Sequence, residues 1–287
     1  MSKVKIGIHQ HVFTSNLNKE NLHILDFIRE IGFDSVDINL RNTTIEFAPE
    51  MRKRAEKLGL FLTGGGSLPR DKEIISQDKQ KRAEAIEYMK GIVRKASKIG
   101  VTLYHGCIYA TAGIFVGRGP TDEEFEYSVN GLKDVANYAK DYGVSLCLEP
   151  ANRYENYLIT TVEDSLKLVN AIDEPNAGLL LDSYHMNIEE KDMYKSIVSA
   201  KGKIFHFHVN ENDRGIPGTG HIPWDDVFKA LKDIDYDRVV AVESFVDNTV
   251  DIASVVAVWR RLASDAETLA RESYKFIKQM SEKYSLM

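Results

Sequence analysis

The chain has 287 residues, 43% hydrophobic and 28% charged, with a formal net charge of −6. This composition is ordinary for a soluble globular protein and argues against a nucleic-acid-binding protein, which normally carries a basic face. No apolar run reaches the roughly 18 residues that would span a membrane, and the first residues have the pattern of a strand, without a secretion signal. Because two cysteines make no disulfide framework, we expect a cytoplasmic protein with no membrane or nucleic-acid partner.

Short apolar segments rich in β-formers recur along the chain. They begin at Val4, Ser35, Leu60, Val101, Val144, Ala177, Lys203 and Val239. Between them, apolar residues three and four positions apart predict helices, for example over 22–32, 82–100 and 128–143. Each of these three ranges ends in glycine (Gly32, Gly100 and Gly143), which takes the left-handed conformation that helix ends favour.

Strands that alternate with helices predict a parallel sheet, and eight such units close most economically into one (β/α)8 (TIM) barrel over residues 1–287. The alternative is an open, doubly wound sheet. Such sheets bind dinucleotides through a glycine fingerprint, and "TGGGS" at 63–67 lacks both its glycine spacing and the acidic residue that should follow. We find no linker or short repeat, so we expect one α/β domain.

The last four predicted strands each end in a residue type that binds metals. These residues are Glu149, Asp182, His208 and Glu243. In a barrel, the carboxyl ends of the strands meet at the mouth where active sites lie. One charged strand end is usually a solvated loop residue, but four in succession predict a metal centre. Three carboxylates and one imidazole favour Mn²⁺, Co²⁺ or Mg²⁺ over structural Zn²⁺.

The seventh predicted strand, "IFHFHV", carries two histidines on one face, because side chains alternate along a strand. His208 is the last inward residue and is therefore the ligand candidate. His206 lies one layer deeper, and we interpret it as a histidine of the barrel interior. We interpret two further histidines and both tryptophans as packing or loop residues: His105, His221, Trp224 and Trp259.

At these strand ends the sequence resembles the ketose 3-epimerases, which include D-tagatose and D-psicose 3-epimerases and have xylose isomerase-like TIM barrels. The motifs that carry the resemblance are "LEPANRYENY" from 148, "LLLDSYHMN" from 179, "HFHVNENDRGIPGTGHIPW" from 206, "VESF" from 242 and "VWRRLASDAETLARESYKFIK" from 258. The resemblance spans nearly the whole chain. It implies an isomerase that inverts C3 of a free ketose, such as D-tagatose, D-psicose, D-fructose or a ketopentose, and that forms a homodimer or homotetramer.

The resemblance also implies roles for individual residues. The four strand-end residues would hold a divalent metal that binds the C2 carbonyl oxygen and a neighbouring hydroxyl and stabilises a cis-enediolate. Glu149 and Glu243 would act as alternating base and acid on opposite faces of the sugar. The implied substrate-binding residues are Glu155, His185, Arg214 and Phe245, with His11 and Tyr109 as further candidates.

The sequence departs from the family pattern where the far end of the sugar would be held. Relatives often carry a tryptophan after the fourth strand, but here the segment is "CIYATAGIFVG", in which Tyr109 or Phe115 are the candidates to replace it. The bare "TGGGS" segment either widens the pocket or forms a tight turn. Alternatives therefore stay open: hydroxypyruvate isomerase, a sugar-phosphate epimerase, or a lyase such as an inosose or dehydroshikimate dehydratase. A metal-dependent DNA repair endonuclease is disfavoured by the net charge of −6 and the eight histidines, and a non-catalytic sugar-binding barrel by the clustered carboxylates.

Overall fold

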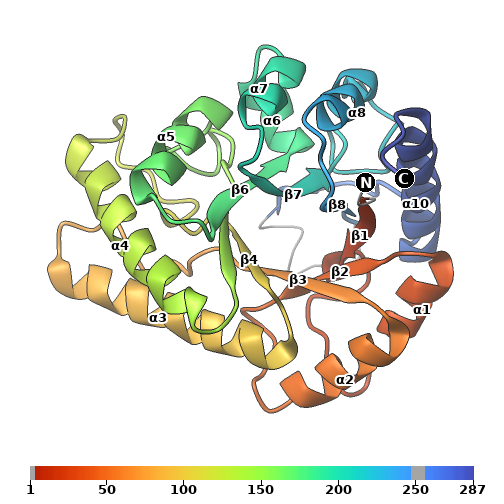
Figure 1. Cartoon of the computed structure of the whole chain (residues 1–287), viewed down its shortest axis with the longest axis horizontal. Coiled ribbons are helices and arrows are strands. Elements are labelled where there is room, and N and C mark those ends of the chain that lie inside the picture. Colours follow the sequence, from red (N-terminus) through yellow and green to blue (C-terminus); the bar gives the residue numbers. More distant parts are fainter. Residues whose placement is uncertain (1–3, 247–255) are drawn as a thin grey trace.

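The computed structural model describes residues 4–246 and 256–287. Its eight parallel strands follow one another around a closed barrel in sequence order (Figure 1). The strands are β1 Lys5–His9, β2 Ser35–Asn39, β3 Phe61–Gly65, β4 Leu103–Gly106, β5 Ser145–Leu148, β6 Ala177–Asp182, β7 Ile204–Val209 and β8 Val239–Val242. Because β1 pairs with β8 along four registered residues, the open-sheet alternative is wrong and the predicted TIM barrel is confirmed.

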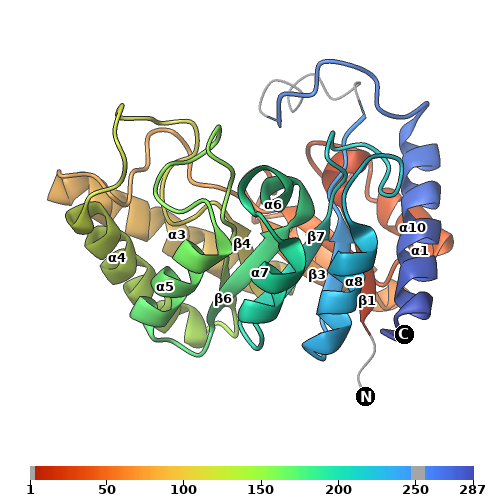
Figure 2. The same cartoon turned by 90° about the horizontal axis from the view of Figure 1, so that it is seen from above.

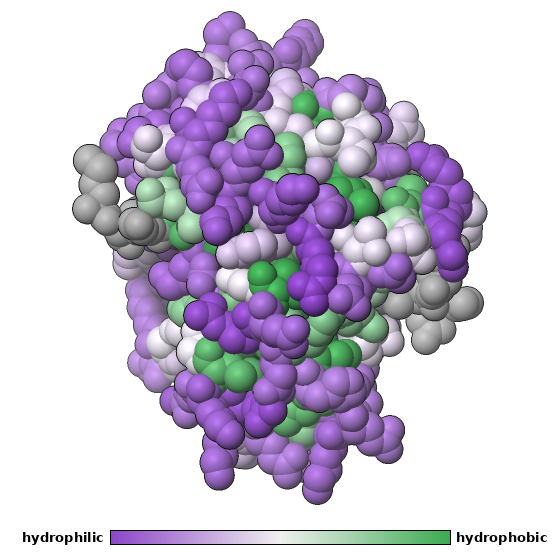
Figure 3. Space-filling model, turned by 90° about the vertical axis from the view of Figure 1, so that its right-hand side faces the viewer, coloured by the Kyte–Doolittle hydropathy of each residue, from purple (hydrophilic) through white to green (hydrophobic). Residues whose placement is uncertain are grey.

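Helices surround the barrel, and the long loops after the strands gather at one end (Figures 1 and 2). The helices are α1 Ile24–Ile31, α2 Ala48–Leu58, α3 Lys79–Ile99, α4 Asp122–Lys140, α5 Val162–Ile172, α6 Ser183–Glu189, α7 Met193–Ser199, α8 Trp224–Asp233 and α10 Ala266–Lys283, with a short 3-10 turn at Gln10–Val12. The outer surface near α10 is mainly hydrophilic, with apolar residues in small patches (Figure 3). No helix in the described part of the chain is long and apolar enough to cross a membrane.

The predicted helix ends are correct in two of three cases. Gly32 and Gly100 directly follow α1 and α3 with φ of 121° and 89°. The prediction for Gly143 is wrong, because α4 already ends at Lys140 and the glycine, with φ of 63°, lies in the turn that follows. The start of α4 is set by a capping box, in which the Thr121 hydroxyl and the Glu124 carboxylate each accept from the other residue's backbone N–H.

The barrel interior has an apolar floor beneath a polar upper layer. Leu103, Cys147, Leu180 and Phe205 form an apolar cluster separate from the main core, which packs between the strands and the helices. The first three lie two residues before His105, Glu149 and Asp182, so alternation places them on the same inward face, one layer down. The polar residues therefore stand on a closed apolar base and face the mouth.

The glycines of "TGGGS" have a packing role. A Cβ at Gly65 would lie 2.5 Å from His105 Cε1, and one at Gly64 would lie 2.8 Å from Leu40 Cγ. The side chains of Leu40 and His105 therefore occupy the space that larger residues on β3 would need. These two glycines therefore form neither a tight turn, because they belong to β3, nor open space, because neighbouring side chains pack against them.

Candidate active site

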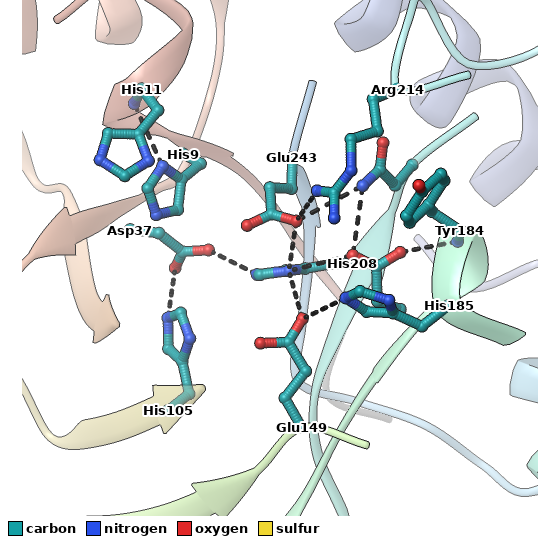
Figure 4. Close-up of polar contacts among 12 residues, drawn as sticks. His9, His11, Asp37, His105, Glu149, Tyr184, His185, His208, Arg214 and Glu243 are labelled. Atoms are coloured by element: carbon teal, nitrogen blue, oxygen red, sulfur yellow. Dashed lines mark hydrogen bonds and ion pairs between the residues drawn. The ribbon is translucent and has the colours of Figure 1, made fainter. Parts of the chain in front are cut away.

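The four predicted metal ligands come together at the barrel mouth (Figure 4). Asp182 ends β6, His208 is the second-last residue of β7, and Glu149 and Glu243 directly follow β5 and β8. His208 Nδ1 lies 3.9 Å from Glu149 Oε1, 3.8 Å from Asp182 Oδ2 and 3.7 Å from Glu243 Oε2. All four ligand atoms lie within 4.8 Å of one another, as a single cation would require.

The surroundings of His208 fit a bound cation. Its Nδ1 is buried and has no hydrogen-bond partner among the residues that the structure describes, whereas its Nε2 lies 3.0 Å from Asp37 Oδ2. Burial disfavours a charged ring, yet Glu243 and the other nearby carboxylates raise the pKa of His208 well above its ordinary value. The site therefore attracts positive charge to the position that Nδ1 faces, and a divalent cation would satisfy both the nitrogen and the carboxylates.

Neighbouring groups orient two of the carboxylates. Asp182 caps α6, where its Oδ1 accepts a hydrogen bond from the Tyr184 backbone N–H at 2.7 Å. The Asn210 side-chain amide donates to Asp182 Oδ2 at 3.2 Å and to Glu243 Oε2 at 3.4 Å. Asn210, which was not predicted from the sequence, thus bridges two of the predicted ligands, as residues around metal sites commonly do.

The two glutamates differ from the other predicted ligands in exposure and from each other in the direction in which their pKa is shifted. Their side chains are 13% and 15% exposed, whereas Asp182 and His208 are at most 1% exposed. Burial and the Glu243 carboxylate raise the pKa of Glu149 well above its usual value. Burial acts the same way on Glu243, but His208 and Arg214 outweigh it and hold the pKa of Glu243 well below its usual value. Carboxyl groups of opposite tendency are suited to act as acid and base.

His185 presents a hydrogen-bond donor beside Glu149. It lies on α6, and its Nδ1 accepts from the Asn152 backbone N–H at 3.2 Å, with the Asn152 amide at 2.8 Å. Because Nδ1 is the acceptor, the ring proton belongs on Nε2. That nitrogen lies 3.7 Å from Glu149 Oε1. The structure therefore places His185 at the mouth, beside Glu149, which is the position predicted for it.

Arg214 also reaches the site, and the loop after β7 holds it there. Its nitrogens donate to Glu243 Oε2 and Glu155 Oε1, each at 3.2 Å. The guanidinium carbon lies 4.1 Å from the centre of the Tyr184 ring and 5.3 Å from that of Phe245. Within residues 4–246 and 256–287, Arg214 Nε is buried without a partner, and the Arg214 backbone has a left-handed φ of 65°. Strain at a non-glycine residue is frequent in functional sites.

One buried carboxylate fixes the loop that carries Arg214. Glu211 is fully buried and accepts hydrogen bonds from the backbone N–H groups of Gly218 at 2.8 Å and Ile222 at 3.2 Å. The indole N–H of Trp224 donates to the same carboxylate at 3.0 Å, which confirms that Trp224 is a packing residue. The Arg214 backbone N–H donates to the Glu211 carbonyl oxygen at 2.9 Å.

The candidates for the far end of the sugar have different positions. His11 lies near the mouth, with its Nε2 2.9 Å from the Asn39 amide and its ring 6.3 Å from that of Phe245. Tyr109 is fully buried, and its hydroxyl donates to the Ile159 carbonyl at 3.0 Å and accepts from the Ala151 N–H at 3.1 Å. This differs from the expectation for Tyr109, because backbone groups already occupy its hydroxyl. Phe115 is 52% exposed.

Asp37, which lies fully buried on β2, was not predicted from the sequence as a site residue. Its Oδ2 is 3.0 Å from Nε2 of both His206 and His208, its Oδ1 is 3.8 Å from His105 Nε2, and the Thr63 hydroxyl also donates to it. His206 is a residue of the barrel interior, as expected, but His105 belongs to this polar cluster and is more than a packing residue. The available signal was an aspartate inside the apolar strand "SVDIN".

The pKa values of His206 and Asp37 in this buried cluster are both lowered. Burial lowers the pKa of His206 to about 4, so its ring is neutral near pH 7. Burial also acts to raise the pKa of Asp37, but the histidines around its carboxylate outweigh that effect and hold it well below its usual value. Asp37 is therefore an anion whose negative charge is stabilised by hydrogen-bond donors.

Comparisons with known proteins agree with this geometry. Residues 25–280 match the family model described as xylose isomerase-like TIM barrel. A probable ketose 3-epimerase of Synechocystis is 31% identical over 277 residues, 96% of each chain, and an L-ribulose 3-epimerase of Mesorhizobium japonicum is 33% identical over 95% of this chain and 93% of that one. A solved structure of L-ribulose 3-epimerase superposes with a TM-score of 0.92 at 32% identity, covering 98% of this chain and 96% of that chain. The chain therefore belongs to the ketose 3-epimerase family of xylose isomerase-like TIM barrels and is a carbohydrate epimerase of the isomerase class.

Proposed function

We propose that this enzyme inverts C3 of a free ketose, such as D-tagatose, D-psicose, D-fructose or a ketopentose, with a divalent cation as cofactor. The observation that carries the proposal is the convergence of three carboxylates on the unpartnered Nδ1 of His208. Named relatives include D-psicose and L-ribulose 3-epimerases, which supports a sugar of this class.

The cation would be held by Glu149, Asp182, His208 and Glu243. Three oxygen ligands and one nitrogen suit Mn²⁺, with Co²⁺ or Mg²⁺ as alternatives. When bound, it would supply positive charge next to the substrate oxygens at C2 and C3, on which negative charge develops as the C3 proton leaves. Burial of Asp182 and His208 would fix it at the base of the site.

Proton transfer would be carried out by Glu149 and Glu243. Inversion requires that a proton leaves one face of C3 and another returns to the opposite face, so it needs two groups. These glutamates follow β5 and β8, which are separated by β6 and β7 around the ring. They are also the two ligands whose side chains keep some exposure, which is the property that contact with a substrate requires.

Substrate oxygens near C1 to C3 would be bound by His185 and Arg214. His185 offers its Nε2–H beside Glu149, and Arg214 offers its guanidinium group beside Glu243. Glu155, through its contact with Arg214, would hold the guanidinium and bind a substrate hydroxyl, and Phe245 would form an apolar wall. Because Arg214 is already paired with two carboxylates, the site favours a neutral sugar over a phosphate ester.

The direct test is to incubate the Mn²⁺-loaded protein with separate free ketoses and to separate the products by chromatography. We expect interconversion of C3 epimers, for example of D-fructose and D-psicose. The Glu149→Gln variant, which keeps the side-chain volume, is the matched control and should be inactive. Formation of an aldose or a dehydrated product, or turnover of phosphate esters alone, would contradict the proposal.

A further inference from the structure

Asp37 and the metal-ligand candidate His208 are joined across the barrel interior. Asp37 lies on β2 and His208 on β7, and both are almost completely buried. The distance of 3.0 Å between Asp37 Oδ2 and His208 Nε2 is that of a good N–H···O hydrogen bond. In Figure 4 the imidazole of His208 lies between Asp37 on one side and the carboxylates of Glu149 and Glu243 on the other.

This contact determines which nitrogen of His208 carries the proton. An imidazole that binds a metal ion keeps one N–H, and a carboxylate next to Nε2 places the hydrogen there. Nδ1 then keeps its lone pair, and Nδ1 is the atom that Glu149, Asp182 and Glu243 surround. The opposite tautomer would direct an N–H at the cation and could not bind it.

Asp37 is itself held in position by other residues. The His206 ring donates through Nε2 at 3.0 Å to the same oxygen that His208 contacts, and the Thr63 hydroxyl donates to Oδ1. The ring of His105 stacks on that of His206 with centroids 5.1 Å apart. The carboxylate therefore has little freedom to rotate away from His208.

We propose that Asp37 is a positioning residue, which holds His208 in the tautomer and ring orientation that allow Nδ1 to bind the catalytic cation. The proposal rests on the proposed function, because it requires a cation at the mouth. Carboxylates that accept from the distal N–H of a metal-bound histidine commonly change metal affinity about 10- to 100-fold when removed. Asp37 would thus act through His208 without touching substrate.

A competing arrangement is a second cation among Asp37, His105, His206 and His208, whose ligand atoms also lie within 4.8 Å of one another. The hydrogen-bonded arrangement is favoured because one Asp37 oxygen lies 3.0 Å from two Nε2 atoms, which are ordinary donor–acceptor distances. The two arrangements predict different metal contents and different positions for the metal.

The test compares the affinity of Co²⁺ for the metal-free full chain with its affinity for two variants. Binding is measured from the visible absorption of bound Co²⁺. Asp37→Asn keeps the volume but replaces the charged acceptor of both rings with a neutral amide oxygen, and we expect Co²⁺ to bind about 10- to 100-fold more weakly. Thr63→Val is the matched control, because it removes the donor to Asp37 Oδ1 and leaves the contact between Oδ2 and His208, so it should weaken Co²⁺ binding by less than the roughly tenfold minimum expected for Asp37→Asn. Thermal unfolding of both metal-free variants measures any loss of stability separately.

Equal affinity of Asp37→Asn and wild type would overturn the inference, as would equal losses in both variants, which would indicate a general structural effect. A crystal of the wild type with Mn²⁺ provides a test that needs no variant. We expect one anomalous peak beside His208 Nδ1, and a peak within bonding distance of Asp37 would make Asp37 a ligand and overturn its positioning role. If the wild type binds no metal, the proposed function fails as well. If the wild type and Asp37→Asn bind metal equally tightly, only this inference fails.

Discussion

The Nδ1 of His185 accepts a hydrogen bond from the Asn152 backbone N–H, which turns the opposite nitrogen toward Glu149 Oε1 at 3.7 Å. A proton donor therefore stands beside a carboxylate proposed to move the C3 proton. Glu149 directly follows β5, and His185 lies on α6, which directly follows the neighbouring strand β6, so the donor position does not depend on the cation.

Replacing His185 by Phe tests whether this donor serves the substrate. The variant keeps a planar ring but loses the Nε2–H, so we expect turnover to fall by up to roughly tenfold, the effect of one neutral hydrogen bond of about 0.5–1.5 kcal/mol. Bound Mn²⁺, measured by elemental analysis, should stay near stoichiometric. Loss of metal with normal folding would show that His185 supports the cation instead.

The Arg214→Ala variant should lose at least about tenfold in turnover while keeping its metal. A lost hydrogen bond to a charged donor costs about 1.5–3 kcal/mol, which corresponds to roughly tenfold or more in rate. Arg214→Lys is the useful comparison, because it keeps the positive charge but lacks the planar guanidinium whose two terminal nitrogens donate to Glu243 and Glu155 at the same time. If either variant unfolds or loses metal, Arg214 has a structural role.

Removal of the cation should abolish activity reversibly. Dialysis against a chelator is expected to stop turnover, and Mn²⁺ or Co²⁺ should restore it. Asp182→Asn and His208→Ala should each reduce metal occupancy, because each removes one of four ligands. Full activity in protein shown to be free of metal by elemental analysis would contradict the cation-dependent mechanism.

Two-base transfer predicts that solvent hydrogen enters the product. In D₂O, deuterium should appear at C3, because the carboxyl group that returns the proton exchanges with solvent. Glu149→Gln and Glu243→Gln should both stop epimerisation, yet each can still exchange the C3 hydrogen of the epimer that faces its remaining glutamate. Conversion without label, detected by mass spectrometry, would indicate a hydride shift or a single shuttling base.

Tyr109→Phe should affect stability more than catalysis. The change leaves the buried Ile159 carbonyl and Ala151 N–H without their partner, which we expect to cost about 1–3 kcal/mol of unfolding free energy. Urea unfolding measures this loss, and the KM for the sugar should change little. Unchanged stability with a raised KM would instead support contact between Tyr109 and the substrate.

The fold and the candidate metal ligands could be predicted from local sequence patterns, whereas contacts between distant residues could not. Each strand is a short apolar run, and each ligand stands at the end of such a run, so alternation and strand order were sufficient to place Glu149 and His208. Asp37 contacts His206 and His208 from 169 and 171 residues away, and nothing local names those partners. Arg214 was found through its motif, but its left-handed backbone depends on contacts that only the folded loop provides.

The buried Glu211 carboxylate has a consequence for how the enzyme meets its sugar. Because it binds Gly218, Ile222 and Trp224 before any substrate arrives, the segment that carries Arg214 has already lost its conformational freedom during folding. Substrate binding therefore loses little further entropy on this side of the mouth, and more of the contact energy remains available as affinity. The β7–α8 connection is therefore a rigid part of the site, and we expect sugars to be distinguished by how well their shapes fit it.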